Sequence, residues 1–142
     1  GALLYIGAGH LDPDPAVYPN AAEHIDEWLA GIDFFFRHVP GLRIMPTIVS
    51  GVVSPKWARS PITWLRRKDI DKRRLAEVGQ SISQLLFPGR LMFTPHVSFA
   101  PPVNIETLYS EGSQEDVLPA VIARTKALLA EHCRVFGGYS GP

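Results

Sequence analysis

Cysteine is almost absent from this chain of 142 residues, since Cys133 is its single copy. One cysteine excludes a disulfide scaffold and any zinc site built on several cysteines. An excess of charge is absent too, because 14 Lys and Arg residues balance 14 Asp and Glu residues. Bulk electrostatics therefore predict no nucleic-acid partner. The sequence also lacks an apolar run of the roughly 18 residues that a transmembrane helix needs.

Apolar residues, in contrast, are plentiful: 46% of the residues are hydrophobic and 10% are aromatic. In a chain of this length, that composition predicts one folded domain with a sizeable core. The chain starts at Gly1 and enters at once an apolar run, residues 2–6, that is typical of a buried strand. We therefore expect residues 1–142 to be a single-domain fragment whose upstream part is missing.

Strand-like and helix-like segments alternate along the chain. Strands are predicted at residues 2–6, 42–53 and 91–99, the last with Val97 and Phe99 on its buried face. Helices are predicted after a capping box at Asn20, from Asp69 to the residues before Phe87, and from about Asp116 to His132. This order predicts an α/β fold with a mixed, largely parallel sheet flanked by helices. The predicted core stripe of the second helix consists of Leu75, Val78, Ile82 and Leu85.

Basic residues are concentrated in one segment. Residues 56–74 hold eight basic and two acidic residues, a net charge of +6, and the rest of the chain carries −6. Tryptophans interleaved with cations suit the interface of an anionic membrane, where each cation near the surface contributes about 1 kcal/mol. An ordinary solvated helix start with two core tryptophans is the alternative, and a nucleic-acid site is a weaker third because no binding motif accompanies the patch. The predicted membrane contacts are Trp57, Trp64, Arg66, Arg67 and Lys68.

A glycine-containing loop, residues 7–12, follows the first predicted strand, where α/β proteins place ligand loops. Gly7 and Gly9 allow backbone amides to approach an anion, and His10 is a titratable group beside them, so these three residues are the predicted substrate-binding residues. His10, Asp12 and Asp14 are also conceivable metal ligands, and a plain turn is the simplest alternative. No second cluster completes a metal site, so none is predicted.

The remaining reactive side chains point to no catalytic centre. The histidines at positions 24, 38, 96 and 132 are scattered and fit surface or structural roles, and Cys133 fits a small buried hydrophobe. The sequence has no nucleophile elbow, no phosphate-binding Walker loop and no G-x-G-x-x-G fingerprint. No catalytic residue is therefore assigned.

Three segments together resemble the phospholipid/glycerol acyltransferase family, the group of glycerol-3-phosphate and lysophosphatidate acyltransferases. Residues 44–51 (IMPTIVSG) match the family's V-P-V-x-I-x-G strand, and residues 97–103 (VSFAPPV) are similar to its later strand ending in G-x-P-I. Residues 3–10 (LLYIGAGH) lie where the family has F-P-E-G-x-R, of which only Gly9 is retained. The resemblance spans roughly residues 2–132 and identifies the chain with the C-terminal part of an acyltransferase-like domain.

The resemblance implies transfer of a fatty acyl group from acyl-CoA or acyl carrier protein to a hydroxyl of a (lyso)phospholipid or glycerol-phosphate-type acceptor. It implies a peripheral protein on the cytoplasmic face of a membrane, with no metal or other cofactor. The family's base is the histidine of an H-x4-D motif that lies N-terminal to these segments. Three residues, not four, separate His10 from Asp14, so the chain shown lacks that motif and is expected to have no turnover alone.

Two other functions remain open from the sequence. The chain is then either a non-catalytic acyltransferase-like module that binds a membrane or a partner, or a small metal-dependent hydrolase that uses His10, Asp12 and Asp14. An N-H-x4-D motif upstream of Gly1 in the parent protein favours the enzyme, and bound metal favours the hydrolase.

Overall fold

The computed structural model describes residues 12–28, 34–35, 38–60, 69–87, 89, 93–111 and 117–140. The strand predicted at residues 2–6 lies outside them. Within the described part, the helices and strands occur in this order along the chain: α1 (Ala21–Asp26), β1 (Thr47–Ser50), α3 (Pro55–Ala58), α4 (Asp69–Leu86), β2 (His96–Phe99), α5 (Ile105–Glu111) and α6 (Leu118–Phe136).

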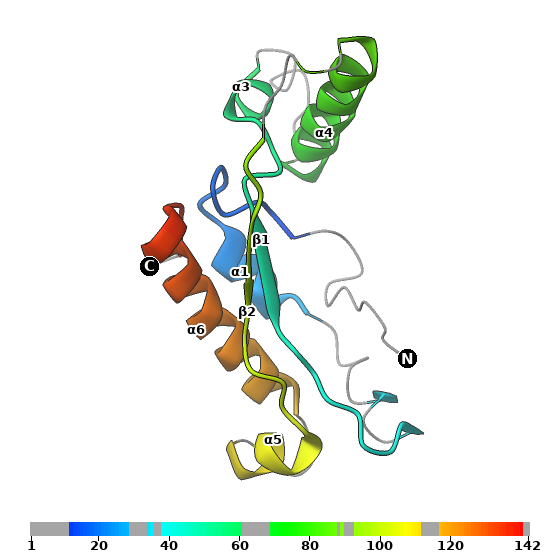
Figure 1. Cartoon of the computed structure of the whole chain (residues 1–142), viewed down its shortest axis with the longest axis vertical. Helices are drawn as coiled ribbons and strands as arrows, with labels where there is room; N and C mark the ends of the chain where they lie inside the picture. Colours follow the sequence, from blue (N-terminus) through cyan, green and yellow to red (C-terminus); the bar gives the residue numbers. More distant parts are fainter. Residues whose placement is uncertain are drawn as a thin grey trace.

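The predicted largely parallel sheet is wrong. In the described residues the sheet has two strands, β1 and β2, and they are antiparallel, with Thr47 opposite Phe99 and Ser50 opposite His96. The chain leaves the end of β1 into α3 and α4 and re-enters the sheet beside that same end (Figure 1). A parallel pair needs a crossover to the opposite end of the sheet, and this connection makes none.

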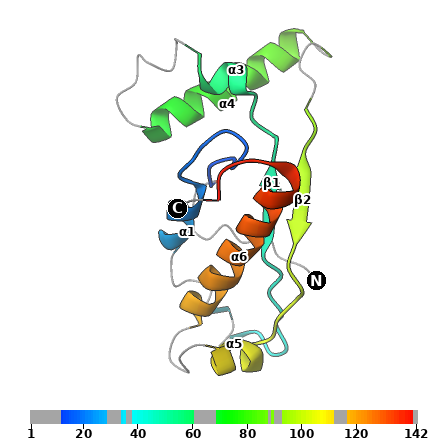
Figure 2. The same cartoon turned by 90° about the vertical axis from the view of Figure 1, so that its left-hand side faces the viewer.

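The ribbon of β1 and β2 lies along α6, with α1 beside them (Figure 2). Ala21 and Ile25 of α1 form a buried cluster with Leu129 and Cys133 of α6, as the prediction of a small buried cysteine requires. A second cluster joins Val103, Leu108, Val117, Ala120 and Val121, and Trp28 packs against both clusters. One cluster therefore lies between α1 and α6, and the other joins α5, the start of α6 and Val103.

The face of β2 that meets this core is the opposite of the predicted one. Val97 and Phe99 point away from α6, and Phe99 is 59% exposed, whereas Ser98 faces inward. The physical reason is a polar partner: buried His132 of α6 bonds to Ser98 and to Ser50, so the two strands present their hydroxyls to the helix. The apolar alternation of β2 favours burial of Val97 and Phe99, and the contact of Ser98 with His132 reverses that preference.

Several helices also differ from their predictions. Helix α1 is short, and Asn20 makes no side-chain capping bond, so the capping box is wrong. Helix α6 is confirmed, with Pro119 in its first turn, and Gly137 with φ 80° follows its last residue. Helix α5 is unpredicted, and the Oδ1 atom of Asn104 accepts hydrogen bonds from the backbone N and the Oγ1 of Thr107 at its start.

Helix α4 forms where it was predicted, but its apolar stripe is not a core stripe. Val78, Ile82 and Leu85 are exposed, and Leu85 is exposed to 83%. The buried face of α4 is instead formed by Ala76 and Gln80. Figure 1 shows the reason, because α3 and α4 form a unit at one end of the molecule, away from α6 and α5.

Candidate functional site

Most of the residues predicted as a site lie outside the described part of the chain. This holds for the predicted substrate-binding residues Gly7, Gly9 and His10, which therefore remain a prediction. It holds equally for four predicted membrane contacts: Trp64, Arg66, Arg67 and Lys68. Trp57 is the predicted site residue that the structure places.

Asp14, one of the conceivable metal ligands, is fully engaged with the backbone. Its carboxylate is 5% exposed and accepts hydrogen bonds from the backbone N atoms of Ala16, Gly51, Val52 and Val53 at 2.8–3.1 Å. Four N–H donors satisfy the lone pairs that a cation would need. Asp14 therefore fixes the chain after β1 to the loop before α1, which is a structural role.

The rest of the proposed metal set is not assembled by the described residues. Asp12 is exposed and accepts a hydrogen bond from Nε1 of Trp28 at 3.1 Å. Among the described side chains, no group of three His, Cys, Asp or Glu residues is placed to hold a metal ion. Because backbone amides already bind the carboxylate of Asp14, this residue is a poor metal ligand, which weakens the alternative of a metal-dependent hydrolase.

A serine–histidine–serine cluster lies in the interior between the ribbon and α6. Nε2 of His132 is 2.7 Å from Oγ of Ser50, and Nδ1 is 2.7 Å from Oγ of Ser98. One ring nitrogen donates and the other accepts, so either neutral tautomer is satisfied. Burial lowers the pKa of His132, and nearby His96 lowers it further, while Asp14 acts in the opposite direction. Burial therefore favours the neutral form of His132.

In this cluster a hydroxyl contacts an imidazole, as a nucleophile contacts its base, but a substrate has no access to either group. Ser50 and His132 are each 1% exposed. The backbone N–H groups of Gly51, Val52 and Val53, which follow Ser50, are already bound to Asp14 and are not free to hold an oxyanion. The cluster therefore serves to join α6 to both strands.

Trp57 of α3 lies against α4, in contact with its one glycine. A Cβ atom added at Gly79 would lie 2.6 Å from Cζ3 of the Trp57 ring, so the indole occupies space that any larger residue would take. Trp57 is half-buried as a result, and not largely exposed. It is equally not a core residue, because it packs on the outlying α3–α4 unit.

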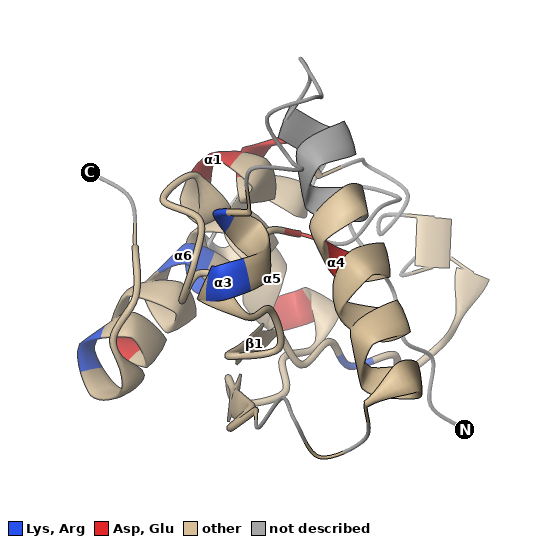
Figure 3. Cartoon of the chain, turned by 90° about the horizontal axis from the view of Figure 1, so that it is seen from above, with Lys and Arg blue, Asp and Glu red and all other residues tan. Residues whose placement is uncertain are grey.

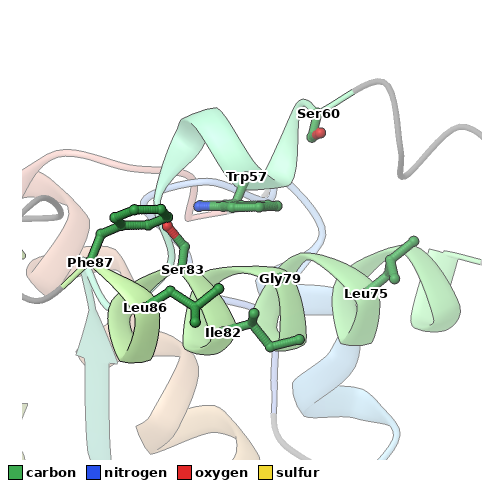
Figure 4. Close-up of a pocket in the computed structure, with 8 residues that line it drawn as sticks. All are labelled: Trp57, Ser60, Leu75, Gly79, Ile82, Ser83, Leu86 and Phe87. Atoms are coloured by element: carbon green, nitrogen blue, oxygen red, sulfur yellow. The ribbon is translucent and has the colours of Figure 1, made fainter.

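An apolar pocket of about 380 Å³ opens between the two helices. In Figure 4 the indole of Trp57 lies over α4 near Gly79, with Leu75 toward one end of the helix and Phe87 toward the other. Ser60 and Ser83 supply the hydroxyl groups of the lining, and none of its described residues is charged. The residues that line the pocket are Trp57, Ser60, Leu75, Gly79, Ile82, Ser83, Leu86 and Phe87.

The apolar surface of this unit extends beyond the pocket. We name as the α4 ridge the exposed apolar residues Val78, Ile82, Leu85, Leu86 and Phe87. Monomeric soluble proteins rarely expose apolar residues contiguously over a large area, so such a surface marks an interaction site. Among the helices that the structure describes, none is long and apolar enough to cross a membrane.

Cations accompany the apolar surface. Lys56 and Arg59 are exposed on and just after α3, and neither pairs with a carboxylate in the described part of the chain. Figure 3 shows the blue of α3 beside α4, which from Leu75 to Leu86 holds one charged residue, Glu77. The α3–α4 unit therefore combines an apolar ridge, an apolar pocket and exposed positive charge.

Sequence reasoning missed two features of these sites. Ser50, Ser98 and His132 were not linked, because their spacing along the chain gives no signal of a contact formed by packing. The exposure of the α4 ridge was missed because helical periodicity identifies a stripe and not its partner. The sequence signal that could have distinguished the buried face of α4 from the exposed one is Gln80, a polar residue that lies on the buried face.

Comparisons of the chain with protein-family models, with curated proteins and with solved structures give no match in any of the three.

Proposed function

We propose that this chain is part of a peripheral, membrane-associated acyltransferase and that its α3–α4 unit is the part that contacts the membrane. The reaction is transfer of a fatty acyl group, from acyl-CoA or acyl carrier protein, to a hydroxyl of a (lyso)phospholipid or glycerol-phosphate-type acceptor. The membrane leaflet is the cytoplasmic one, where these donors occur. The reaction class comes from the sequence resemblance, and the membrane contact comes from the α4 ridge.

The observation that carries the proposal is the α4 ridge beside the exposed cations Lys56 and Arg59. Val78, Ile82 and Leu85 recur at helical spacing on one exposed side of α4. Burying one such side chain in the acyl region contributes about 1.5–3 kcal/mol, and each nearby cation adds about 1 kcal/mol on an anionic surface. Two anchoring side chains and two cations are thus enough for reversible binding.

The described residues supply scaffold and membrane contact in this proposal, and not the base. The Ser50–His132–Ser98 cluster holds β1, β2 and α6 together, and Asp14 binds the segment that leads from β1 to the α3–α4 unit. The hydroxyl of the acceptor must lose its proton to a general base as the acyl carbon is attacked. We assign that base to a residue outside the described part.

Co-sedimentation with vesicles tests the membrane contact. We expect binding to phosphatidylglycerol-containing vesicles to exceed binding to phosphatidylcholine vesicles and to weaken with salt, because charges are screened beyond about 10 Å at 0.1 M. The double change Val78→Glu and Leu85→Glu should reduce binding at least about tenfold. Val135→Glu is the matched control, since Val135 is a comparably exposed apolar residue on α6. Equal loss in the control would overturn the proposal.

A non-catalytic membrane-binding module is the second candidate. The observation in its favour is that the serine–histidine contact of the described part is inaccessible. Release of CoA from acyl-CoA with a lysophospholipid acceptor separates the two, when measured on the parent protein with the residues upstream of Gly1. Turnover that depends on an upstream histidine supports the enzyme, and vesicle binding without turnover supports the module.

A further inference from the structure

We propose that the pocket between α3 and α4 binds the hydrocarbon chain of a free long-chain fatty acid, with the carboxylate held near Lys56 and Arg59. This proposal rests on the proposed function to the extent that the α3–α4 unit faces lipid. It goes further because it assigns a site that binds one amphiphile per chain, in addition to the contact with a bilayer.

The walls of the pocket select a hydrocarbon. Five of its eight lining residues have large apolar side chains, namely Trp57, Leu75, Ile82, Leu86 and Phe87. A polar ligand would lose its hydration there with few hydrogen bonds in return, which costs several kcal/mol. The occupying group is therefore apolar and gains by leaving water.

The size and shape of the pocket select one chain. Its volume of about 380 Å³ lies near the lower end of the roughly 300–1,000 Å³ of small-molecule sites. The lining residues follow α4 from Leu75 to Phe87, so the pocket is elongated along the helix axis (Figure 4). An elongated apolar space of this size suits a single acyl chain better than the two chains of a phospholipid.

Charge selects the head group. Lys56 and Arg59 flank Trp57 in sequence, are exposed, and pair with no carboxylate in the described part of the chain. Long Lys and Arg side chains can lay their apolar stems along the pocket and present their charge at its rim. An anionic head is favoured there, which distinguishes a fatty acid from a neutral alcohol or ester.

The pocket depends on glycine at position 79, because the indole of Trp57 occupies the space that a side chain there would need. The Trp57 indole rests where a Cβ at position 79 would lie, and this contact sets the depth of the pocket on that side. A larger residue at position 79 would displace the indole and disturb α3. For a test, Ser83 is the better position, because its small side chain lines the pocket without this close contact.

The test measures binding of a fluorescent long-chain fatty acid, below its micelle concentration and without vesicles, to the full chain. We expect saturable binding of one probe per chain, weakened at least about tenfold by Ser83→Leu, which fills the pocket. Ser81→Leu is the matched control on an exposed position of α4 and should bind as the unchanged chain does. Lys56→Gln with Arg59→Gln should weaken binding of the acid and leave its methyl ester unaffected.

Unchanged binding in Ser83→Leu, or equal affinity for acid and methyl ester, would overturn this proposal. Vesicle sedimentation keeps its failure separate from that of the proposed function, because Ser83→Leu leaves the α4 ridge intact. A chain that sediments through Val78 and Leu85 but binds no fatty acid contradicts the pocket assignment alone. A chain that binds the fatty acid but not vesicles contradicts the membrane contact alone.

Discussion

Asp14 carries more backbone hydrogen bonds than any other side chain described above. The donors lie in two segments that are distant from each other in sequence. Ala16 is two residues from Asp14, and Gly51, Val52 and Val53 follow β1. Hydrogen bonds to a charged acceptor contribute about 1.5–3 kcal/mol each, and a donor left unpaired in the interior costs about as much. One carboxylate thus fixes the direction in which the chain leaves β1 toward α3.

We predict that Asp14→Asn lowers the free energy of unfolding by about 2–4 kcal/mol, because the amide loses one acceptor oxygen and the negative charge. Urea unfolding followed by circular dichroism measures this loss. Asp26→Asn is the control, since Asp26 makes an exposed ion pair with Lys126 at 2.7 Å, and such pairs contribute about 0–1 kcal/mol. Similar losses in the two variants would contradict the role given to Asp14.

His132 makes the stability of the fold depend on pH. Its pKa in the folded chain is lowered from the ordinary value of 6.5, chiefly by burial. The folded state therefore binds this proton less readily than the unfolded state, so the stability contributed by neutral His132 is present above pH 6.5 and lost as the pH falls through the folded-state pKa.

We predict that, as the pH falls from 6.5 to the lowered folded-state pKa, the free energy of unfolding falls more steeply in the unchanged chain than in His132→Gln. Glutamine keeps a polar side chain near Ser50 and Ser98 but has no proton to gain in this range. Urea titrations at a series of pH values on either side of neutrality measure the slope. Parallel slopes in the two proteins would show that His132 is not the responsible group.

At the scale of elements, Gln80 connects the α3–α4 unit to the rest of the molecule. Its side chain is buried, accepts a hydrogen bond from the backbone N of Ser54 at 2.8 Å, and donates one to the backbone O of Val52 at 2.8 Å. Both partners lie on the segment that leads from β1 to α3. The amide therefore ties the middle of α4 to the connection that also binds Asp14.

We predict that Gln80→Ala destabilises the chain by about 1–3 kcal/mol, since it leaves two backbone groups unpaired near the base of the unit. Hydrogen exchange should show the largest loss of protection in residues 52–58 and in α4. Gln84→Ala, one helical turn further along and exposed, should change stability by less than about 0.5 kcal/mol. Loss of protection spread evenly over α6 would contradict a local tie.

The elements also show what the sequence can and cannot predict here. Helices α4 and α6 are long and periodic, and both form where periodicity and the Pro119 position placed them. The facing of β2 and of α4 was wrong, because the deciding contacts of Ser98 and Gln80 come from distant residues. The prediction of a parallel sheet was wrong for a related reason. An alternating order of strands and helices does not indicate whether the helices between two strands lead the chain back to the same end of the sheet, as α3 and α4 do here.

At the scale of the whole molecule, two regions of different character lie end to end. The ribbon, α1, α5 and α6 hold the buried clusters, and the α3–α4 unit holds the apolar ridge and pocket (Figure 1). The described residues of the basic segment, 56–60 and 69–74, belong to the second region. Stability and lipid contact are thus assigned to separate parts, so variants of the ridge should leave folding intact.

The most direct measurement places an environment-sensitive fluorophore on the ridge. The single cysteine, Cys133, is buried, so Cys133→Ala provides a background for labelling at Leu85→Cys on α4 or at Val135→Cys on α6. On addition of phosphatidylglycerol-containing vesicles, we predict a blue shift and increased emission at position 85, with little change at position 135. A shift at position 135 alone, or at neither position although the chain sediments with the vesicles, would contradict the claim that the α4 ridge is the membrane contact.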